Sequence, residues 1–492
     1  MDSAPHPDPT PCSHPKTQNL HNSAQEKNSP NLNNFAQPEK QNPDPRPPTP
    51  APASVAATAS ELRRELGLRD LVLFNIAAVI GIRWLAAAAH TGPVSITLWV
   101  LAAAFFFVPS ALAVSTLSAR FPEEGGIYVW TKHAYGDWHG FLCGWCYWLS
   151  NLFYFPNLIF TGVAMAGYAL GLNEVKIYVI STSLVILWIG LLTNIFGMSI
   201  AKWTDNLGAI ATYTGGVLII VFGFIVWMRF GSATAIHLRP HFDLDNVNFW
   251  SQIAFAFGGL ELGAILGGEI RNPARTVPRA AWISGSMIAV FYIAGTLALL
   301  VLMPPERISI LTGLVQAGTE TGARLGSPWL SRALIVLILI GVAGQLGAWI
   351  GGSARLPFVI GVDRYLPPPF ARLHPRWGTP HVAILAQGIA CTAFVIALEA
   401  GENLRIAYQL LVDMSVITYF IPFLYMFSTA WKYGRRGSAV LGLAVTVISM
   451  AVSMVPPPDA HSVWLFEFKI VAGCAVLIGG ARVLFLAALR RR

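Results

Sequence analysis

Residues 255–263 read FAFGGLELG, a glycine pair followed by a glutamate inside an apolar run. Residues 77–84 read AAVIGIRW, with a glycine and an arginine inside another apolar run. Glycine weakens a helix by about 1 kcal/mol relative to alanine, and a charged residue at mid-membrane costs about 2.5–3.5 kcal/mol on insertion scales. Both stretches therefore predict a helix interrupted at membrane depth, where irregular backbone persists only if it is buried in protein or lines a cavity.

The composition places these stretches in a membrane protein. The chain has 492 residues, of which 54% are hydrophobic and 12% charged, and its mean hydropathy is +0.55. A soluble domain carries about 25% charged residues, and a larger core does not remove the need to hydrate its surface. The net charge of +8 does not indicate a nucleic-acid partner, because the basic residues are spread between apolar segments rather than gathered on one face.

Apolar segments of about 20 residues or more, long enough to cross a bilayer, recur from residue 70 onward. We place twelve of them, near residues 70–89, 94–117, 139–170, 176–197, 207–229, 250–270, 280–303, 333–354, 380–399, 406–429, 437–455 and 463–487. The sequence therefore predicts an all-α polytopic membrane protein, with a transporter domain over residues 65–488.

Residues 1–60 have a different composition. They hold thirteen prolines among Asn, Gln, Ser and Asp, and they lack the apolar core of a signal peptide. Such a segment buries too little apolar surface to offset its chain entropy. We expect a disordered, Pro-rich cytoplasmic tail.

The Lys and Arg residues of the connecting segments predict the orientation. If the tail is cytoplasmic, 19 of them lie in cytoplasmic segments and 7 outside. The 19 fall within residues 63–69, 120–132, 202, 271–279, 355–376, 432–436 and 490–492. This bias predicts a multi-pass protein of the inner (plasma) membrane with both termini in the cytoplasm.

Several other classes of function are not expected. The chain has no GxxxxGK[ST] phosphate loop, so it is not predicted to drive transport with ATP on its own. Cys143 and Cys146 imitate a redox motif, but they lie in an apolar helix with no strand before it. His90, His133 and His139 lack metal-ligand spacing. We expect no metal, no cofactor and no enzymatic activity, since no His, Asp and Ser cluster is found near one face.

The two interrupted segments occupy matching places in the chain. One opens the first five predicted spans, about residues 70–229, and the other opens the second five, about residues 250–429. Interrupted helices at corresponding positions of two halves indicate the substrate site of an inverted-repeat transporter.

Four motifs, in order along the chain, resemble those of the amino acid–polyamine–organocation permeases. They are residues 261–280 (ELGAILGGEIRNPARTVPRA), similar to the sixth-helix signature; residues 121–130 (FPEEGGIYVW), similar to the loop between helices two and three; residues 345–349 (QLGAW) with 354–355 and 366–367, similar to the eighth helix; and residues 376–380 (RWGTP), similar to the start of the ninth. The resemblance covers roughly residues 65–430.

This resemblance implies a LeuT-like fold of two inverted five-helix repeats and two additional helices, at about residues 437–487. The substrate site would lie between the breaks in helices one and six, with walls from helices three, eight and ten. A half-helix amino terminus suits a substrate carboxylate, and carbonyl groups freed at a break accept from an ammonium group. The substrate-binding residues we expect are Gly81, Ile82, Arg83, Asn151, Phe255, Phe257, Gly258, Gly259 and Trp349.

The expected roles differ among these residues. Phe255 and Phe257 match an aromatic cap over the substrate, Gly258 and Gly259 would supply unwound backbone, and Trp349 matches an aromatic wall on helix eight. Asn151 and Tyr154 lie near one face of the third span at helical spacing.

Two carboxylates are candidates for coupling or gating. Glu261 is interpreted either as a proton-linked group or as a structural group that ties helix six to a neighbour. Glu269 lies near Arg271 and Arg275 in the sequence, which favours a salt bridge at the cytoplasmic end.

Arg83 departs from the family pattern, which has a second glycine at this place. Three interpretations remain open: it binds a carboxylate of the substrate, it takes the place of a sodium ion as a fixed charge, or it pairs with Glu261 or Asp413. Either of the last two would argue against sodium coupling.

We therefore predict secondary active transport of amino acids across the cytoplasmic membrane by alternating access, coupled to protons or to exchange. One alternative is an antiporter that exchanges an amino acid for its amine, and another is a non-transporting sensor of the same fold. The predicted partners are a small-molecule substrate and the lipid bilayer, and the sequence does not specify an oligomeric state.

Overall fold

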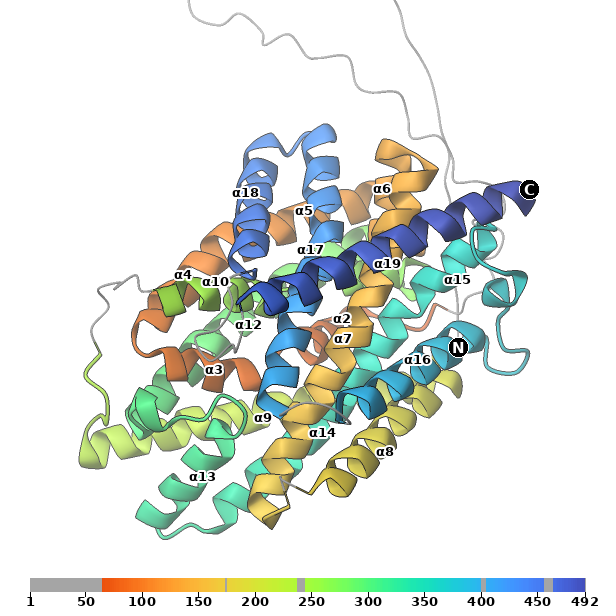
Figure 1. Ribbon diagram of the computed structural model, residues 1–492. Coiled ribbons are helices and arrows are strands. Elements are labelled where there is room, and N and C mark those ends of the chain that lie inside the picture. Colours follow the sequence, from red (N-terminus) through yellow and green to blue (C-terminus); the bar gives the residue numbers. More distant parts are fainter. Residues whose placement is uncertain (1–63, 173–174, 237–243, 400–403, 455–462, 492) are drawn as a thin grey trace, which may run out of the picture. The chain divides into compact units, whose positions relative to one another are not determined.

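The structure is a computed structural model that describes residues 64–172, 175–236, 244–399, 404–454 and 463–491. Almost all of these residues are helical or lie in short turns between helices (Figure 1), because backbone groups in a bilayer must be satisfied within the chain. The predicted tail, residues 1–60, lies outside the described residues.

The helices of the first half follow one another with short connections. They are α2 (Leu68–Val79), α3 (Arg83–Thr91), α4 (Val94–Ala102), the π-helical turn η1 (Ala103–Phe107), α5 (Val108–Arg120), α6 (Ile127–Tyr135), α7 (Asp137–Leu170), α8 (Lys176–Ile195) and α9 (Met198–Phe230). Glycines precede several of them, and Gly136, with φ +88°, separates α6 from α7.

The second half begins with another interrupted helix. Its elements are α10 (Leu244–Ala256), α11 (Leu262–Ile265), η2 (Gly267–Glu269), α12 (Pro273–Leu302), η3 (Pro305–Arg307), α13 (Gly313–Arg324), α14 (Trp329–Ser353), α15 (Arg355–Val362), η4 (Pro368–Ala371), α16 (His381–Glu399), α17 (Leu404–Lys432), α18 (Arg436–Val452) and α19 (Val463–Arg491). Pro273 at the first position of α12 is typical of a helix start, where its missing N–H leaves no bond unmade.

Every predicted span coincides with a helix or an interrupted helix pair, but the number of crossings that length and composition support is smaller than twelve. Among the described residues, eight helices are long and apolar enough to cross a membrane, and the bent pair α2–α3 makes a ninth. Shorter apolar helices at His381–Ile396 and Arg436–Val452, and the interrupted α10–α11 pair, occupy the other predicted positions. Because these segments are short or broken, their length is not sufficient to identify them as membrane-spanning helices.

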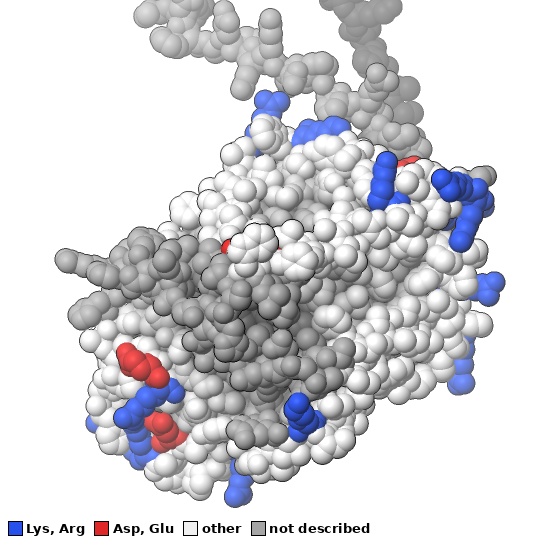
Figure 2. Space-filling model, viewed as in Figure 1, with Lys and Arg blue, Asp and Glu red and all other residues white. Residues whose placement is uncertain are grey.

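Apolar side chains cover much of the outer surface. Val290 on α12, Ile177 on α8 and Val476 on α19 are 64%, 72% and 72% exposed. Figure 2 shows a mainly white surface, with more Lys and Arg than Asp and Glu and most of them near its edges. Such a large exposed apolar surface is typical of a face covered by another apolar phase, here the lipid of a multi-pass membrane protein.

Helices α9 and α14 form the most extensively packed pair in the described part of the chain. Gly208 on α9 faces Gly344 on α14 so closely that a Cβ atom added to Gly208 would lie 2.5 Å from the Gly344 Cα. Small residues at such positions let two membrane helices approach. Helix α14 also packs against α2 and α7, and this places its inner face beside the first break.

The chain just before α2 is tied to the chain just after η2. The Leu66 N–H donates to the Glu269 carbonyl (N–O 3.0 Å), and the Arg271 N–H donates to the Leu66 carbonyl (N–O 2.9 Å). This short β-bridge joins the two interrupted segments at one end.

Candidate functional site

The first break lies where the sequence places it. Helix α2 ends at Val79, α3 begins at Arg83, and their axes differ by 48°. Arg83 is thus the first helical residue after the break rather than part of it. A Cβ atom at Gly81 would lie 2.8 Å from the Trp84 ring, so glycine is required under this indole.

The second break separates α10 from α11, between Ala256 and Leu262. Gly259 has φ +114°, a conformation that side chains with a Cβ rarely adopt. A Cβ atom there would lie 3.0 Å from the Val79 Cγ2 and 3.4 Å from the Trp349 ring. The two breaks are therefore in direct contact, with the smallest residue at the point where they meet.

The hydroxyl of Tyr292, on α12, joins the two breaks. It accepts from the Gly81 N–H (N–O 3.1 Å), and its proton is within reach of both the Val79 carbonyl (O–O 2.7 Å) and the Ala256 carbonyl (O–O 3.1 Å). Tyr292 is fully buried. One side chain thus satisfies backbone groups that both interrupted helices leave unpaired.

Two side chains of α14 satisfy a further carbonyl at the first break. The Gln345 Nε2 and the Trp349 Nε1 both donate to the Ala78 oxygen, at 3.0 and 2.7 Å. Gln345 and Trp349 are one turn apart and so lie on the same helix face. Because a carbonyl oxygen has two lone pairs, the Ala78 oxygen has no capacity left for a substrate ammonium group.

Arg83 lies buried beside a small cavity. Its side chain is 3% exposed, and its Nη1 donates to the Gln345 Oε1 at 3.5 Å. Its Cζ lies 4.4 Å from the Trp84 ring centre and 5.2 Å from the Tyr154 ring centre. The cavity, of about 20 Å³, is also lined by Thr161 on α7 and by Thr212 on α9.

Arg83 takes part in none of the ion pairs found among the described residues, and its Nε and Nη2 have no hydrogen-bond partner there. None of these ion pairs joins Arg83 to Glu261, and the pairing with Glu261 or Asp413 that the sequence left open stays a prediction. Stacking on two aromatic rings compensates a buried cation only in part.

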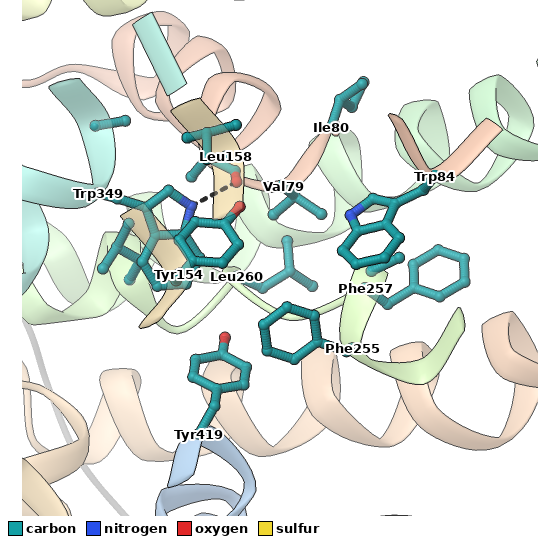
Figure 3. Close-up of a cluster of buried hydrophobic side chains, with 14 of the residues drawn as sticks. Val79, Ile80, Trp84, Tyr154, Leu158, Phe255, Phe257, Leu260, Trp349 and Tyr419 are labelled. Carbon is teal, nitrogen blue, oxygen red and sulfur yellow. Dashed lines mark hydrogen bonds between the residues drawn. The ribbon is translucent and has the colours of Figure 1, made fainter. Parts of the chain in front are cut away.

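An aromatic layer closes the site on one side. Figure 3 shows Phe255 between Trp84 and Tyr419, with Tyr154 next to it and Trp349 beside Tyr154. The Phe255 ring centre lies 5.9 Å from that of Trp84, 5.9 Å from that of Tyr154 and 5.2 Å from that of Tyr419. Phe255 and Trp349 thus belong to one cluster of buried rings that meets at Tyr419, and their roles toward a substrate stay predictions.

Glu261 is bound by two tyrosines from different helices. Its Oε1 accepts from the Tyr147 hydroxyl of α7 (O–O 2.7 Å) and from the Tyr419 hydroxyl of α17, and its Oε2 accepts from the Gly259 N–H (N–O 3.2 Å). Glu261 is 1% exposed. The carboxyl group therefore links the second break to both α7 and α17.

A second group of buried charges lies near the end of the second interrupted segment. The Arg355 Nη2 lies 2.9 Å from the Glu269 Oε1, and the Arg355 Nε lies 3.2 Å from the same oxygen. Glu124 accepts from the Gly268 N–H (N–O 2.7 Å), and its Oε1 has no hydrogen-bond partner among the described residues. Burial, and then the charge of Glu269, raise the pKa of Glu124 to about 8, although Arg355 acts in the opposite direction.

Glu269 therefore has a partner that the sequence did not identify. Its neighbours in sequence, Arg271 and Arg275, suggested a local salt bridge, but helix α15 brings Arg355 to Glu269 from 86 residues away. The Arg271 Nε instead donates to the Arg64 carbonyl.

Of the nine expected substrate residues, Ile82 and Arg83 line the cavity, and two of the others, Phe257 and Asn151, also lie apart from the aromatic layer. Phe257 turns toward the surrounding helices, with its ring centre 5.5 Å from that of Trp99 and 5.6 Å from that of Tyr292. Asn151 donates to the Tyr147 carbonyl of its own helix and does not line the cavity. Gly81, Ile82, Gly258 and Gly259 lie at or beside the two breaks, as expected.

Sequence reasoning missed the groups that hold the breaks in place. Tyr292, Tyr147 and Tyr419 lie in apolar helices, and no local pattern distinguishes them from core residues. Gln345 had a usable signal, because it lies four residues before Trp349 and so shares its helix face.

Most of the chain matches one known family. Residues 66–477 match the family model described as amino acid permease. The chain belongs to the amino acid permease family. This is a family of membrane transporters rather than enzymes, and it implies an amino acid substrate.

The permease is similar to several bacterial transporters. It is 28% identical over 444 residues to an uncharacterized transporter of Legionella pneumophila, and the aligned region covers 85% of this chain and 95% of that protein. It is 28% identical over 355 residues to an uncharacterized transporter of Mycobacterium tuberculosis (70% and 76%). It is 23% identical over 349 residues to a probable agmatine/putrescine antiporter of Lactococcus lactis (68% and 72%).

Tyr292→Phe is expected to loosen both breaks. Losing the hydroxyl leaves the buried Gly81 N–H and at least one carbonyl unpaired, which costs about 1–3 kcal/mol. The thermal unfolding midpoint of the purified permease in detergent should fall. Tyr213→Phe is the matched control, since the Tyr213 hydroxyl makes none of the hydrogen bonds found among the described residues. Equal midpoints for the two variants would contradict the role of Tyr292.

Glu124→Gln is expected to stabilise the permease in a pH-dependent way. A raised pKa means that the folded protein binds this proton more tightly than the unfolded chain, whose carboxyl pKa is about 4.3. The corresponding stabilisation is complete below about pH 4.3 and is lost as the pH rises to about 8. The gap in unfolding midpoint between Glu124→Gln and the native chain should therefore widen from pH 5 to pH 8 and then level off.

The exposed Glu306 provides the control for this experiment. The difference in unfolding midpoint between Glu306→Gln and the native chain should stay constant over the same pH range. If the difference in unfolding midpoint between Glu124→Gln and the native chain is also constant from pH 5 to pH 8, Glu124 is already ionised in the folded permease at pH 5.

Proposed function

We propose that this permease carries amino acids across the cytoplasmic membrane by alternating access, with coupling to protons or to exchange. The proposal includes a LeuT-like arrangement of twelve membrane helices, two inverted repeats of five followed by α18 and α19. All twelve predicted spans coincide with helices or interrupted helix pairs, which supports this arrangement. The two breaks, in the first span of each predicted repeat, support it as well.

The observation that carries the proposal is the direct contact between the two breaks. Gly259 lies against Val79, and Tyr292 bonds to backbone on both sides of that contact. Helix α3 begins in the same region and directs the positive end of its dipole there, although its Trp84 and Leu85 N–H groups already donate to the Gly81 and Ile82 carbonyls. An amino acid carboxylate is the natural ligand for such a terminus.

Two barriers fit the alternating opening of this site. One is the ring of Phe255, which packs on Trp84 and Tyr154. The other is Glu261, held by hydroxyls from α7 and α17. Opening toward one side requires Phe255 to leave its neighbours, and opening toward the other requires the tyrosines to release Glu261.

The charges near the site favour protons over sodium as a coupling ion. Arg83 places a permanent cation beside the first break, where a bound sodium ion would be repelled. Glu261 is a buried carboxyl group that can exchange a proton when the two tyrosines move away. The excess of Lys and Arg in the segments assigned to the inside supports cytoplasmic termini.

The test is counterflow of labelled amino acids in proteoliposomes that contain the purified permease. We expect saturable counterflow without ATP that is unchanged when choline replaces sodium. Glu261→Gln keeps the oxygen that accepts from the tyrosines but cannot carry a proton. This variant should retain exchange while losing any stimulation by a pH gradient.

Three results would contradict or narrow this proposal. Binding of an amino acid without any flux would identify a sensor instead of a transporter. Stimulation by sodium would contradict the account of Arg83. Flux only when the opposite side holds the matching amine would assign an antiporter, as the name of the Lactococcus lactis relative describes for that protein.

A further inference from the structure

We infer that Arg83 forms a subsite for a carboxylate group of the transported molecule, and that it excludes substrates that carry only amino groups. The inference rests on the proposed function and names the chemistry of its substrate. It develops one of the interpretations that the sequence leaves open for this residue.

The first argument is the incomplete bonding of the guanidinium. Arg83 remains charged at any physiological pH, and it is 3% exposed. Two of its three nitrogens lack a partner among the described residues, and the third donates a long bond to the neutral Gln345. A buried cation with unmade hydrogen bonds is stabilised strongly by an anion that supplies both charge and acceptors.

The second argument is the cavity beside this group. Its lining includes the hydroxyl-bearing Thr161 and Thr212, and none of its lining residues is acidic. Its volume of about 20 Å³ accommodates a group of about the size of one water molecule. One oxygen of a carboxylate therefore fits beside the guanidinium in this conformation, and the rest of the substrate lies toward the Trp84, Tyr154 and Phe255 rings, which have to move apart to admit it.

The third argument is the lack of acceptors for a cation at the same place. The Ala78 carbonyl already receives two donors, and the Val79 carbonyl lies within reach of the Tyr292 hydroxyl. A diamine placed here would meet a fixed positive charge and few free oxygens. This arrangement differs from what a carrier of agmatine or putrescine requires, although one such probable antiporter is similar to the permease in sequence.

The test measures binding, independently of transport, with matched pairs of molecules that differ by one carboxylate. The pairs are L-arginine and agmatine, L-ornithine and putrescine, L-lysine and cadaverine, and L-leucine and isoamylamine. Each is titrated against the full-length permease in detergent, with the shift in thermal midpoint as the readout. We expect at least one amino acid to bind and none of the amines to do so.

The variants are Arg83→Gln, which removes the charge, and Arg83→Lys, which keeps it. Arg83→Gln should weaken binding of the amino acid by about 10- to 100-fold, the effect of losing a hydrogen bond to a charged group. Arg83→Lys should weaken it less, and Arg324→Gln, at an exposed position on α13, should have no effect. Size-exclusion chromatography of each variant checks that it is folded.

Two sources of the anion are distinguished by replacing chloride with gluconate. If the cavity instead holds a chloride ion, the thermal unfolding midpoint of the substrate-free native permease will fall when gluconate replaces chloride. The midpoint of Arg83→Gln will then stay the same. That pair of results overturns the inference. It is also overturned if an amino acid binds Arg83→Gln with unchanged affinity, or if an amine binds the native permease as well as its amino acid. If no amino acid binds at all, the proposed function fails together with the inference.

Discussion

The structure depends on the requirement that every backbone N–H and carbonyl group inside a membrane be hydrogen-bonded. Two helices stop within the predicted spans, and their ends would carry unpaired groups at a cost of several kcal/mol each in lipid. The Tyr292 hydroxyl, the Gln345 amide and the Trp349 indole supply the missing bonds from two neighbouring helices. The breaks are therefore held by α12 and α14, and the packing of α9 on α14 keeps these donors in position.

The same constraint explains why charged groups gather where the helices are interrupted. Glu261 finds three donors only because the second break turns the Gly259 N–H toward it. Arg83 occupies the first turn after the other break, in a region already depleted of free carbonyls. A negative and a positive group thus lie on the two interrupted segments without pairing with each other, and this leaves each of them able to respond to a ligand or a proton.

The sequence was sufficient to predict the helical class, the places of both breaks and the family. Glycines weaken a helix and charged side chains are costly inside a bilayer, so these predictions rested on strong energetic terms. Residues 80–82 and 257–261 are indeed non-helical or turn-like.

The details of the site could not be predicted in this way, because they depend on which distant side chain meets which break. Phe257 and Asn151 had a suitable type and position in sequence but lie apart from the cavity, whereas Tyr292 gave no signal. The pairing of Glu269 with Arg355 likewise depends on the long-range packing of α15.

Substrate protection of a cysteine placed in the first break tests the central claim most directly. In a background without the native cysteines, Ile82→Cys should react with a membrane-impermeant, negatively charged thiol reagent, and a transported amino acid should slow this reaction. Val290→Cys, on the apolar outer face of α12, should not react. If Ile82→Cys is as unreactive as Val290→Cys, or reacts at the same rate with and without substrate, the break does not line a substrate pathway.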